Sequence, residues 1–218
     1  MTRLTGPGHR TILLIVLGEP RRDRKTERRA AIRREIVDAA WQIARDKGLA
    51  QVTLRDVADL VGMRPPSLYT HFESKNAIYD AMFGDAWTQY AEHSKTAEAD
   101  EPRTSRAAMR FYARVFFDFA VAFPARHQLM NLRTIPDFTP SADAYAPSMA
   151  VMEHFVARMA RHGVHGRDDI DLFVAIVSGM IDAQLANDPG GTRWSGLLDR
   201  AVDMFADNIG ITDERSRP

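Results

Sequence analysis

The sequence predicts an all-α protein of about nine helices, and three observations lead to this fold class. Apolar residues recur at spacings of three and four in one segment after another, as the buried face of an α-helix requires. Residues that start helices (Ser, Thr) and residues that end them (Gly) stand at the edges of these segments. No segment shows the alternating pattern of a half-buried strand. With 45% apolar and 27% charged residues, the 218-residue chain is able to bury a packed core.

Residues 1–28 read as a basic, flexible N-terminal extension. The stretch from Thr11 to Gly18 is apolar like the core of a signal peptide, but charged residues follow it where a cleavage site would stand. It is shorter than the ~18 apolar residues of a membrane helix, so no membrane partner is expected. The extension is either a solvated leader or an arm that touches DNA, and a mis-assigned upstream start codon is a further alternative. Its basic residues next to the first helix are Arg21, Arg22, Arg24, Lys25 and Arg28.

An apolar stripe predicts the first helix over about residues 30–47. Ile32, Ile36, Ala40 and Ile43 recur at helical spacing and would all face the core. Gly48 follows at once, and glycine is the usual residue just after a helix end.

Two short helices joined by a glycine turn are predicted next. Thr53 is able to cap the first of them through its side-chain oxygen. Gly62 permits a sharp turn, and Pro65 suits the first position of the second helix, where a missing N–H needs no partner. Ser74 can then cap a fourth helix, over about residues 75–93.

This pair of helices has the form of a helix-turn-helix, and its domain is predicted to span residues 29–75. The second helix would enter the major groove of double-stranded DNA, where each base pair presents a distinguishable edge. Arg64 is able to donate two hydrogen bonds to a guanine. Lys75 and the free N–H groups at the start of the fourth helix would bind phosphate. The predicted DNA contacts in this segment are Arg64, Pro65, Ser67, Tyr69, Thr70, His71 and Lys75.

The distribution of charge along the chain supports a polyanionic partner for the first part. Residues 1–75 hold 15 Lys and Arg against 9 Asp and Glu, a net charge of +6, and residues 76–218 carry −6. The formal net charge of zero conceals this split. It suggests that only the first part meets nucleic acid, although a chance division of surface charge is the alternative.

The segment from Ile36 to Ile78 resembles the DNA-binding domain of the TetR family of transcriptional regulators. The resemblance rests on Ile36, Ala39, Ala40, Gly48 and Gly62 and on the runs VTLRDVA (52–58), LYTHF (68–72) and SKNA (74–77). It implies phosphate contacts from Thr53, Tyr69, His71 and Lys75, with base reading from residues 64–67. The chain departs from the family at Arg64, where a small polar cap is common, and at the two prolines that follow.

Residues 76–218 are predicted to form a helical ligand-binding and dimerisation domain. Beyond the fourth helix, the apolar patterns predict helices over about residues 105–123, 125–132, 148–162, 168–187 and 192–209. Three prolines between residues 133 and 147 predict a long loop or a lid there.

A cavity between these helices would be lined by aromatic and methionine side chains, most of which serve as ordinary core. Such a lining predicts a largely apolar ligand. The candidate ligand-binding residues are Tyr112, Phe116, Phe119, Met130, Met152, Phe155, Phe173 and Met180. The polar residues that could orient a ligand are Arg114, Asp118, Arg133 and Gln184.

The sequence gives little support for a disulfide, a metal site or a catalytic site. The chain has no cysteine, which excludes disulfides, thiolate metal ligands and a cysteine nucleophile. His162 and His165 lack the further ligands that a metal needs, so neither a metal nor a cofactor is expected. No catalytic motif stands out, and an enzyme is not expected.

The leading hypothesis is a cytoplasmic, ligand-responsive dimeric repressor. The family resemblance implies a homodimer through the last two helices, which would place two recognition helices ~34–36 Å apart, or a multiple of this, on a near-palindromic operator. A small, largely apolar effector would tilt the fourth helix and release the DNA. The alternatives are a DNA-binding regulator without a small-molecule ligand, controlled by protein partners or abundance, and an unrelated all-α interaction protein.

Overall fold

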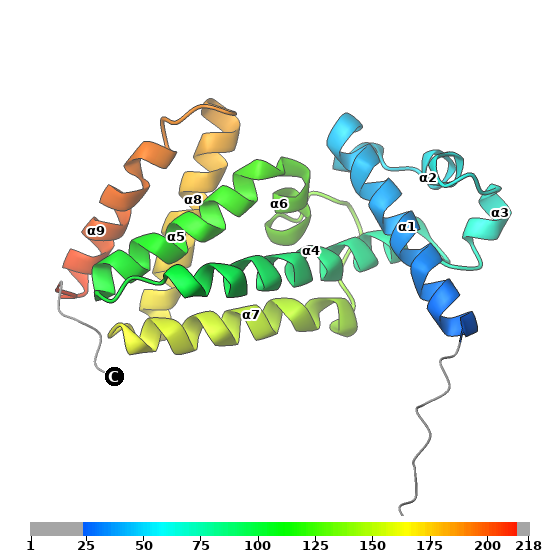
Figure 1. Ribbon diagram of the computed structural model, residues 1–218. Helices are drawn as coiled ribbons and strands as arrows, with labels where there is room; N and C mark the ends of the chain where they lie inside the picture. Colours follow the sequence, from blue (N-terminus) through cyan, green and yellow to red (C-terminus); the bar gives the residue numbers. More distant parts are fainter. Residues whose placement is uncertain (1–23, 213–218) are drawn as a thin grey trace, which may run out of the picture.

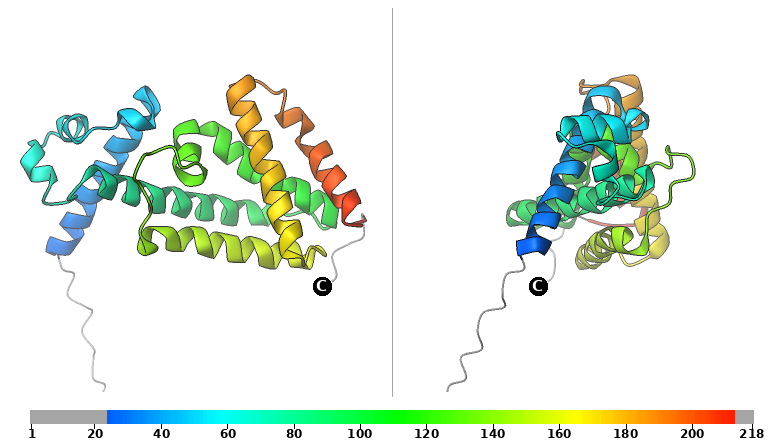
Figure 2. Two further views of the ribbon diagram at one scale, coloured as in Figure 1. Left: turned by 180° about the vertical axis from the view of Figure 1, so that it is seen from behind. Right: turned by 90° about the vertical axis from the view of Figure 1, so that its right-hand side faces the viewer.

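One long helix joins the two parts of the molecule. The computed structural model describes residues 24–212, and in it α4 (Lys75–Ala97) runs from the first helices into the body (Figure 1). The first part consists of α1 (Arg24–Lys47), the short turn η1 (Leu49–Gln51), α2 (Leu54–Leu60) and α3 (Pro65–Leu68). It lies at one end of the molecule, as the view from behind also shows (Figure 2).

The body is built from the remaining helices around the second half of α4. Its elements are η2 (Glu98–Asp100), α5 (Ser105–Ala122), α6 (Pro124–Asn131), α7 (Ala142–Arg161), α8 (Arg167–Asn187), η3 (Ser195–Leu197) and α9 (Leu198–Asn208). The prediction of an all-α fold is therefore confirmed, with nine α-helices and no strand between residues 24 and 212. Within the same residues, no helix is long and apolar enough to cross a membrane.

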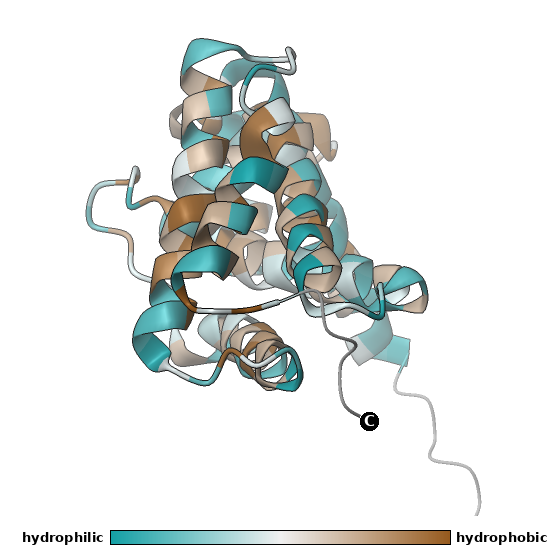
Figure 3. Cartoon of the chain, turned by 90° about the vertical axis from the view of Figure 1, so that its left-hand side faces the viewer, coloured by the Kyte–Doolittle hydropathy of each residue, from teal (hydrophilic) through white to brown (hydrophobic). Residues whose placement is uncertain are grey.

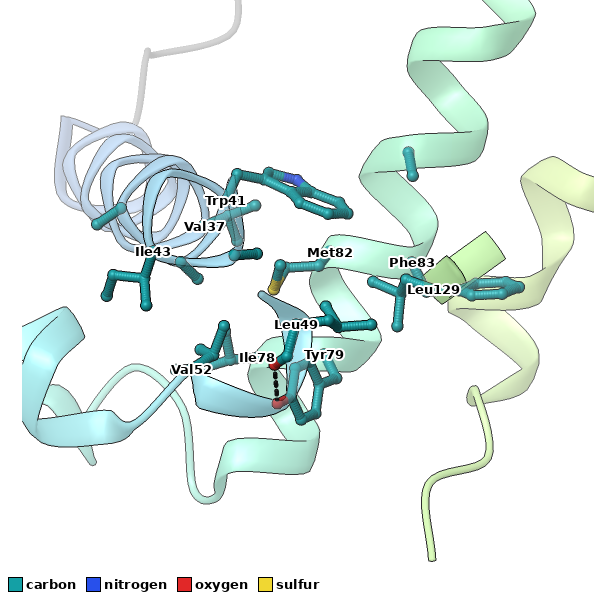
Figure 4. Close-up of a cluster of buried hydrophobic side chains, with 14 of the residues drawn as sticks. Val37, Trp41, Ile43, Leu49, Val52, Ile78, Tyr79, Met82, Phe83 and Leu129 are labelled. Atoms are coloured by element: carbon teal, nitrogen blue, oxygen red, sulfur yellow. Dashed lines mark hydrogen bonds between the residues drawn. The ribbon is translucent and has the colours of Figure 1, made fainter. Parts of the chain in front are cut away.

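The core of the first part continues past residue 75 into α4. Ile78, Tyr79 and Met82 are fully buried against α1 and η1, as the close-up shows (Figure 4). The hydroxyl of Tyr79 donates a hydrogen bond to the Leu49 carbonyl at 2.8 Å. The first helices and the start of α4 therefore share a single packed cluster.

A second apolar cluster holds α5, α8 and α9 together. Phe117, Phe173 and Phe205 are buried within it, and the rings of Phe173 and Phe205 meet edge to face with centroids 5.4 Å apart. Figure 3 looks onto this end of the molecule and shows hydrophilic and hydrophobic residues interspersed along its helices. At the surface, arginines of α5 spaced four apart pair with aspartates of α9 spaced four apart: Arg106 with Asp207, Arg110 with Asp203, and Arg114 with Asp199.

Two predicted helix starts are wrong because interactions outside the apolar pattern extend the helices. α1 begins at Arg24 instead of Ala30, since the intervening charged residues are good helix formers although they bury nothing. α7 begins at Ala142 instead of Ser148, and Pro147 lies inside it. Its first turns form because the Ser141 side chain caps the Ala144 N–H and because Ala144 is buried against α4.

Other predicted boundaries differ by smaller amounts. α4 extends to Ala97, four residues beyond the prediction, and the last helix begins at Leu198 after a turn that includes η3. The predicted loop at residues 133–147 is shorter, because α7 takes up its second half. Of the predicted N-terminal extension, residues 1–23 lie outside the described residues and residues 24–28 form the start of α1.

Candidate nucleic-acid interface and adjoining cavities

The helix-turn-helix is shaped by the local signals that its sequence carries. The Thr53 side chain accepts a hydrogen bond from the Asp56 N–H at 3.1 Å and so caps α2. Gly62 has a φ of 66°, a left-handed conformation that suits glycine in the turn before α3. Ser74 accepts from the Ala77 N–H at 3.1 Å and caps α4.

The recognition helix α3 is a single turn that starts on two prolines. Arg64 occupies the N-cap position without a capping side-chain hydrogen bond. Pro65 and Pro66 have no N–H, so the first turn has fewer donors that need a cap. Arg64, both prolines and Ser67 are exposed on the side that faces away from the core. The first turn is therefore stable without the small polar cap expected of the family.

The remaining predicted DNA contacts differ in exposure and in whether their polar groups already form hydrogen bonds within the protein. Tyr69 is 53% exposed, and the side chain of Thr53 is exposed too. The Thr70 hydroxyl donates to the Ser67 carbonyl at 2.7 Å, so its hydrogen must turn before it can reach a phosphate. Lys75 donates to the Ala50 carbonyl at 3.3 Å with one of its three hydrogens.

His71 is the least accessible of the predicted contacts. Its ring is half-buried, and its Nδ1 is buried without a hydrogen-bond partner among the described residues. Its backbone carbonyl accepts from the Arg33 side chain. The Arg33 contact ties the backbone of His71 to α1.

Two basic residues of α1, Arg29 next to the predicted basic arm and Arg33, contact the end of the recognition segment, a contact that was not predicted from the sequence. Arg29 donates to the Thr70 carbonyl at 3.4 Å, and the Arg33 guanidinium lies 3.9 Å from the centre of the Phe72 ring. Burial and the nearby charge of Arg29 lower the pKa of Arg33 from its usual value. Their spacing of four puts both on one helix face, but nothing in the sequence says which segment that face meets.

A second set of contacts links α1 to the body. The Trp41 indole N–H donates to Asp85 of α4 at 2.9 Å, and its ring meets Phe123 edge to face at 5.3 Å. Arg126 of α6 donates to Gln89 of α4 at 3.1 Å. Burial raises the pKa of Asp85, while its hydrogen bonds from Trp41 and Gln89 oppose that shift. A movement of α4 therefore reaches α1 directly.

The second half of α4 borders two adjoining cavities. The inner cavity has a volume of about 110 Å³ and a mainly apolar lining from α4 to α8: Trp87, Tyr90, Tyr112, Ala113, Phe116, Asn131, Val151, Met152, Phe155, Phe173, Val174, Val177 and Ser178. The outer cavity, of about 340 Å³, has a more polar lining: Tyr90, Ala91, Ser94, Lys95, Glu98, Tyr112, Ala150, Val151, His154, Phe155 and Arg158. The two share Tyr90, Tyr112, Val151 and Phe155, so they meet at these side chains.

The structure brings five of the eight predicted ligand-binding residues to the inner cavity: Tyr112, Phe116, Met152, Phe155 and Phe173. The other three do not line it. Phe119 is buried between the Tyr90 ring and the Arg126 guanidinium, which lies 3.5 Å from the ring centre. Met130 borders a separate cavity under the loop after α6, and Met180 packs against the second apolar cluster. Trp87 and Tyr90 were missed, because their spacing in α4 is equally typical of core residues.

Two of the four polar residues predicted to orient a ligand, Arg114 and Gln184, have structural partners instead, and neither Asp118 nor Arg133 lines the inner cavity. The Arg114 side chain donates to the Ser195 carbonyl at 2.9 Å, and Gln184 accepts from the N–H groups of Trp194 and Ser195. His162 is buried and bonds to Glu101 at 2.9 Å. From residue 24 to residue 212, no group of three or more His, Asp or Glu side chains is placed to hold a metal ion.

The comparisons with known sequences agree with the helix-turn-helix geometry. The family profile described as "Bacterial regulatory proteins, tetR family" matches residues 36–82. The chain is 31% identical over 98 residues to the HTH-type transcriptional regulator YobS of Bacillus subtilis, a match that covers 45% of this chain and 50% of YobS. It is 32% identical over 72 residues to the tetracycline repressor protein class C of Escherichia coli, which covers 33% of each. The chain thus spans half or less of the length of these two relatives.

Solved structures extend the likeness to the whole fold. The crystal structure of a TetR family transcription regulator from Marinobacter aquaeolei VT8 superposes with a TM-score of 0.59 at 16% identity, over 87% of this chain and 100% of that one. At this identity the likeness concerns the fold alone. Together with the profile match, it confirms the resemblance of residues 36–78 to the DNA-binding domain of the TetR family of bacterial regulatory proteins.

Proposed function

We propose that this protein is a dimeric repressor that binds a near-palindromic operator through α2 and α3 and leaves it when a small, largely apolar effector enters the cavities. The observation that carries the proposal is the course of α4. Its first residues belong to the core of the helix-turn-helix, and its second half lines both cavities. A ligand that prefers one position of α4 would therefore change the placement of α3.

The DNA-binding part of the proposal rests on exposure and charge. Arg64, Ser67 and Tyr69 are exposed around one turn of helix, and Thr53 and Lys75 lie at the two ends of the motif. Arg64 and Ser67 would meet base edges, while Thr53, Tyr69, His71 and Lys75 would bind phosphates. Such a repressor works in the bacterial cytoplasm, where its operator lies.

The dimer would form through α8 and α9. Leu172 of α8, Leu197 of η3 and Met204 of α9 are large apolar residues with 46%, 42% and 64% of their surface exposed. Exposed apolar side chains on neighbouring helices suit a two-fold interface. A relative named as a tetracycline repressor supports both repression and a small-molecule effector.

The test uses the full-length protein and DNA fragments recovered by a genome-wide binding map. Lys75→Gln should weaken binding at every sequence and reduce the slope of log K against log salt by about one. Tyr69→Phe should weaken binding without changing that slope, because it removes a neutral donor. Lys95→Gln, at the opposite end of α4, is the matched control and should leave DNA binding unchanged. Wild-type binding with no sequence preference, or variants that bind as tightly as the wild type, would refute the assignment.

A further inference from the structure

The positive charge of the DNA-binding part is concentrated at the start of α1 and not in the recognition motif. Residues 24–35 contain six Lys and Arg against two Glu, a net charge of +4. Residues 36–47 contain two basic and two acidic residues, a net charge of zero. Residues 48–74, which hold η1, α2 and α3, contain two Arg against three Asp and Glu, a net charge of −1. Because binding to DNA phosphates depends on Lys and Arg, the start of α1 carries the charge that the motif itself lacks.

Contacts within the protein place this charge beside the recognition segment, residues 64–72. The Arg29 side chain donates to the Thr70 carbonyl at 3.4 Å, and the Arg33 side chain donates to the His71 carbonyl. Thr70 and His71 are themselves predicted DNA contacts. Figure 1 and Figure 2 both show the first turn of α1 at the same end of the molecule as α3. A DNA backbone bound at the end of the recognition segment would therefore pass close to the start of α1.

The charges of the two contacting arginines are not balanced by a carboxylate. Burial and then the charge of Arg29 lower the pKa of Arg33, and no acidic residue opposes that shift. Arg29 is exposed, and its bond to Thr70 uses one of the five N–H donors of a guanidinium. A phosphate beside Arg29 would supply the negative charge that this pair lacks, and an arginine binds phosphate with two parallel hydrogen bonds.

Helix geometry adds two further basic side chains on the same side of α1. At 3.6 residues per turn, Lys25, Arg28 and Arg29 lie within roughly 100° of one another around the helix, while Glu27 lies on the opposite side. Lys25 precedes Arg29 by one turn, on the face that meets the recognition segment. All three basic side chains are exposed. They form a continuous surface, which we call the α1 basic face.

We propose that the α1 basic face is a second DNA-binding surface. Lys25, Arg28 and Arg29 bind backbone phosphates next to those bound by the recognition segment. They contribute affinity at every sequence and read no bases, whereas α3 sets the sequence preference. The family profile begins at residue 36, so this surface lies outside the part of the chain that it matches. The inference rests on the proposed DNA binding by α2 and α3 and extends it.

The salt dependence of operator binding tests the α1 basic face. The full-length protein and a variant with Lys25→Gln, Arg28→Gln and Arg29→Gln are titrated onto an operator fragment recovered by the genome-wide map, by fluorescence anisotropy at several salt concentrations. The slope of log K against log salt should become shallower by about 2.7 in the triple variant, from about 0.9 for each lost phosphate contact. The affinity ratio between the operator and a scrambled fragment should stay the same. An unchanged slope, or a lost sequence preference, would overturn the proposal.

Two further variants separate phosphate binding from a structural effect. The double variant Lys25→Gln and Arg28→Gln leaves the bond between Arg29 and Thr70 in place, and it should still reduce the slope by about 1.8. Arg34→Gln is the matched control, because Arg34 is exposed in α1 but lies about half a turn away from the centre of the α1 basic face. It should change the slope by less than half as much as one of the proposed contacts. A control effect as large as one contact, or a double variant with the wild-type slope, would contradict the assignment.

The outcome separates this inference from the function on which it rests. If Lys75→Gln reduces the slope but the triple variant does not, the helix-turn-helix binds DNA without α1, and this inference alone fails. If the triple variant reduces the slope but the wild type binds all sequences equally, the α1 basic face holds and the operator-specific function fails.

Discussion

The two halves of α4 are packed in different ways. In the first half, Ile78, Tyr79, Met82 and Ala86 are fully buried, and the Tyr79 hydroxyl is bonded to the Leu49 carbonyl. In the second half, the corresponding face lines cavities and the Trp87 N–H is buried without a partner in the described chain. The first half of α4 is therefore closely packed and its buried hydroxyl has a partner, whereas the second half borders cavities and has a buried N–H without a partner in the described chain.

This difference suggests that the two halves of α4 have different roles. The close-packed half is able to transmit a displacement, because dense cores do not absorb movement easily. Trp41 connects that half to α1 through Asp85, and Arg126 of α6 bonds to Gln89, just inside the second half. The second half borders two cavities that have room for a ligand. Substitutions in the two regions should therefore differ in their cost to stability.

The largest contrast is expected between two methionines. Met82→Ala removes a fully buried side chain from the first half of α4 and should lower the free energy of unfolding by about 2–5 kcal/mol. Met152→Ala, at a cavity-lining position that is 40% exposed, should cost less than about 1 kcal/mol. Denaturant unfolding at one protein concentration measures both. Similar costs for the two variants would contradict the contrast in packing.

A smaller contrast is expected between two tyrosines that undergo the same substitution. Tyr79→Phe removes the hydroxyl that donates to the Leu49 carbonyl, which keeps only the longer bond from the Val52 N–H, and should cost about 1–2 kcal/mol. Tyr112→Phe removes a buried hydroxyl that lies beside the Glu101 carboxylate but forms no hydrogen bond of ordinary geometry within residues 24–212, so the variant should lose less stability than Tyr79→Phe. Denaturant unfolding of the two tyrosine variants measures both changes in the free energy of unfolding. A clear loss of stability in Tyr112→Phe would mean that its hydroxyl is used within the fold.

The smallest expected effect is a dependence of the protein's stability on pH, caused by Asp85 near the middle of α4. Because burial raises the pKa of Asp85 in the folded state, the folded protein holds that proton more tightly than the unfolded chain does. The stability of the wild type should therefore fall as pH rises from about 3.9, the ordinary value for Asp, through the raised folded pKa, and then level off.

Asp85→Asn should lack that loss while its side-chain oxygen can still accept from Trp41. The stability difference, wild type minus variant, should therefore decrease with rising pH across this window. Asp38 and Arg126, whose charges also act on Asp85, are present in both proteins and largely cancel in the difference. Unfolding curves between pH 4 and 7 provide the measurement. A stability difference that rises with pH would contradict a raised pKa of Asp85 in the folded state.

Local chemistry explains why the helix-turn-helix could be predicted from the sequence. The caps at Thr53 and Ser74 and the turn at Gly62 act within a few residues, so their patterns are complete in the sequence. The start of α7 could not be predicted in the same way. It depends on Ala144 and Tyr145 packing against α4, with Tyr145 stacked on Phe83 at 5.9 Å, and this overrides the effect of Pro147.

The cavities depend even more on distant contacts. Periodicity identifies which residues face inward but not which of them meet other side chains and which are left beside a void. Phe119 and Phe116 lie three apart in α5, yet only Phe116 lines the inner cavity, because Arg126 covers Phe119. Arg29 and Arg33 show the same limit at the DNA-binding end, since their carbonyl partners lie about forty residues away in the chain, at Thr70 and His71.

The central claim is that a ligand beside the second half of α4 controls DNA binding at its first half. The most direct measurement is the affinity of the full-length protein for its operator, by fluorescence anisotropy, with and without a saturating small apolar ligand found by calorimetric titration. The affinity should fall at least about tenfold, a coupling of about 1.4 kcal/mol. An operator affinity that stays the same while calorimetry shows the cavity to be saturated would contradict the account.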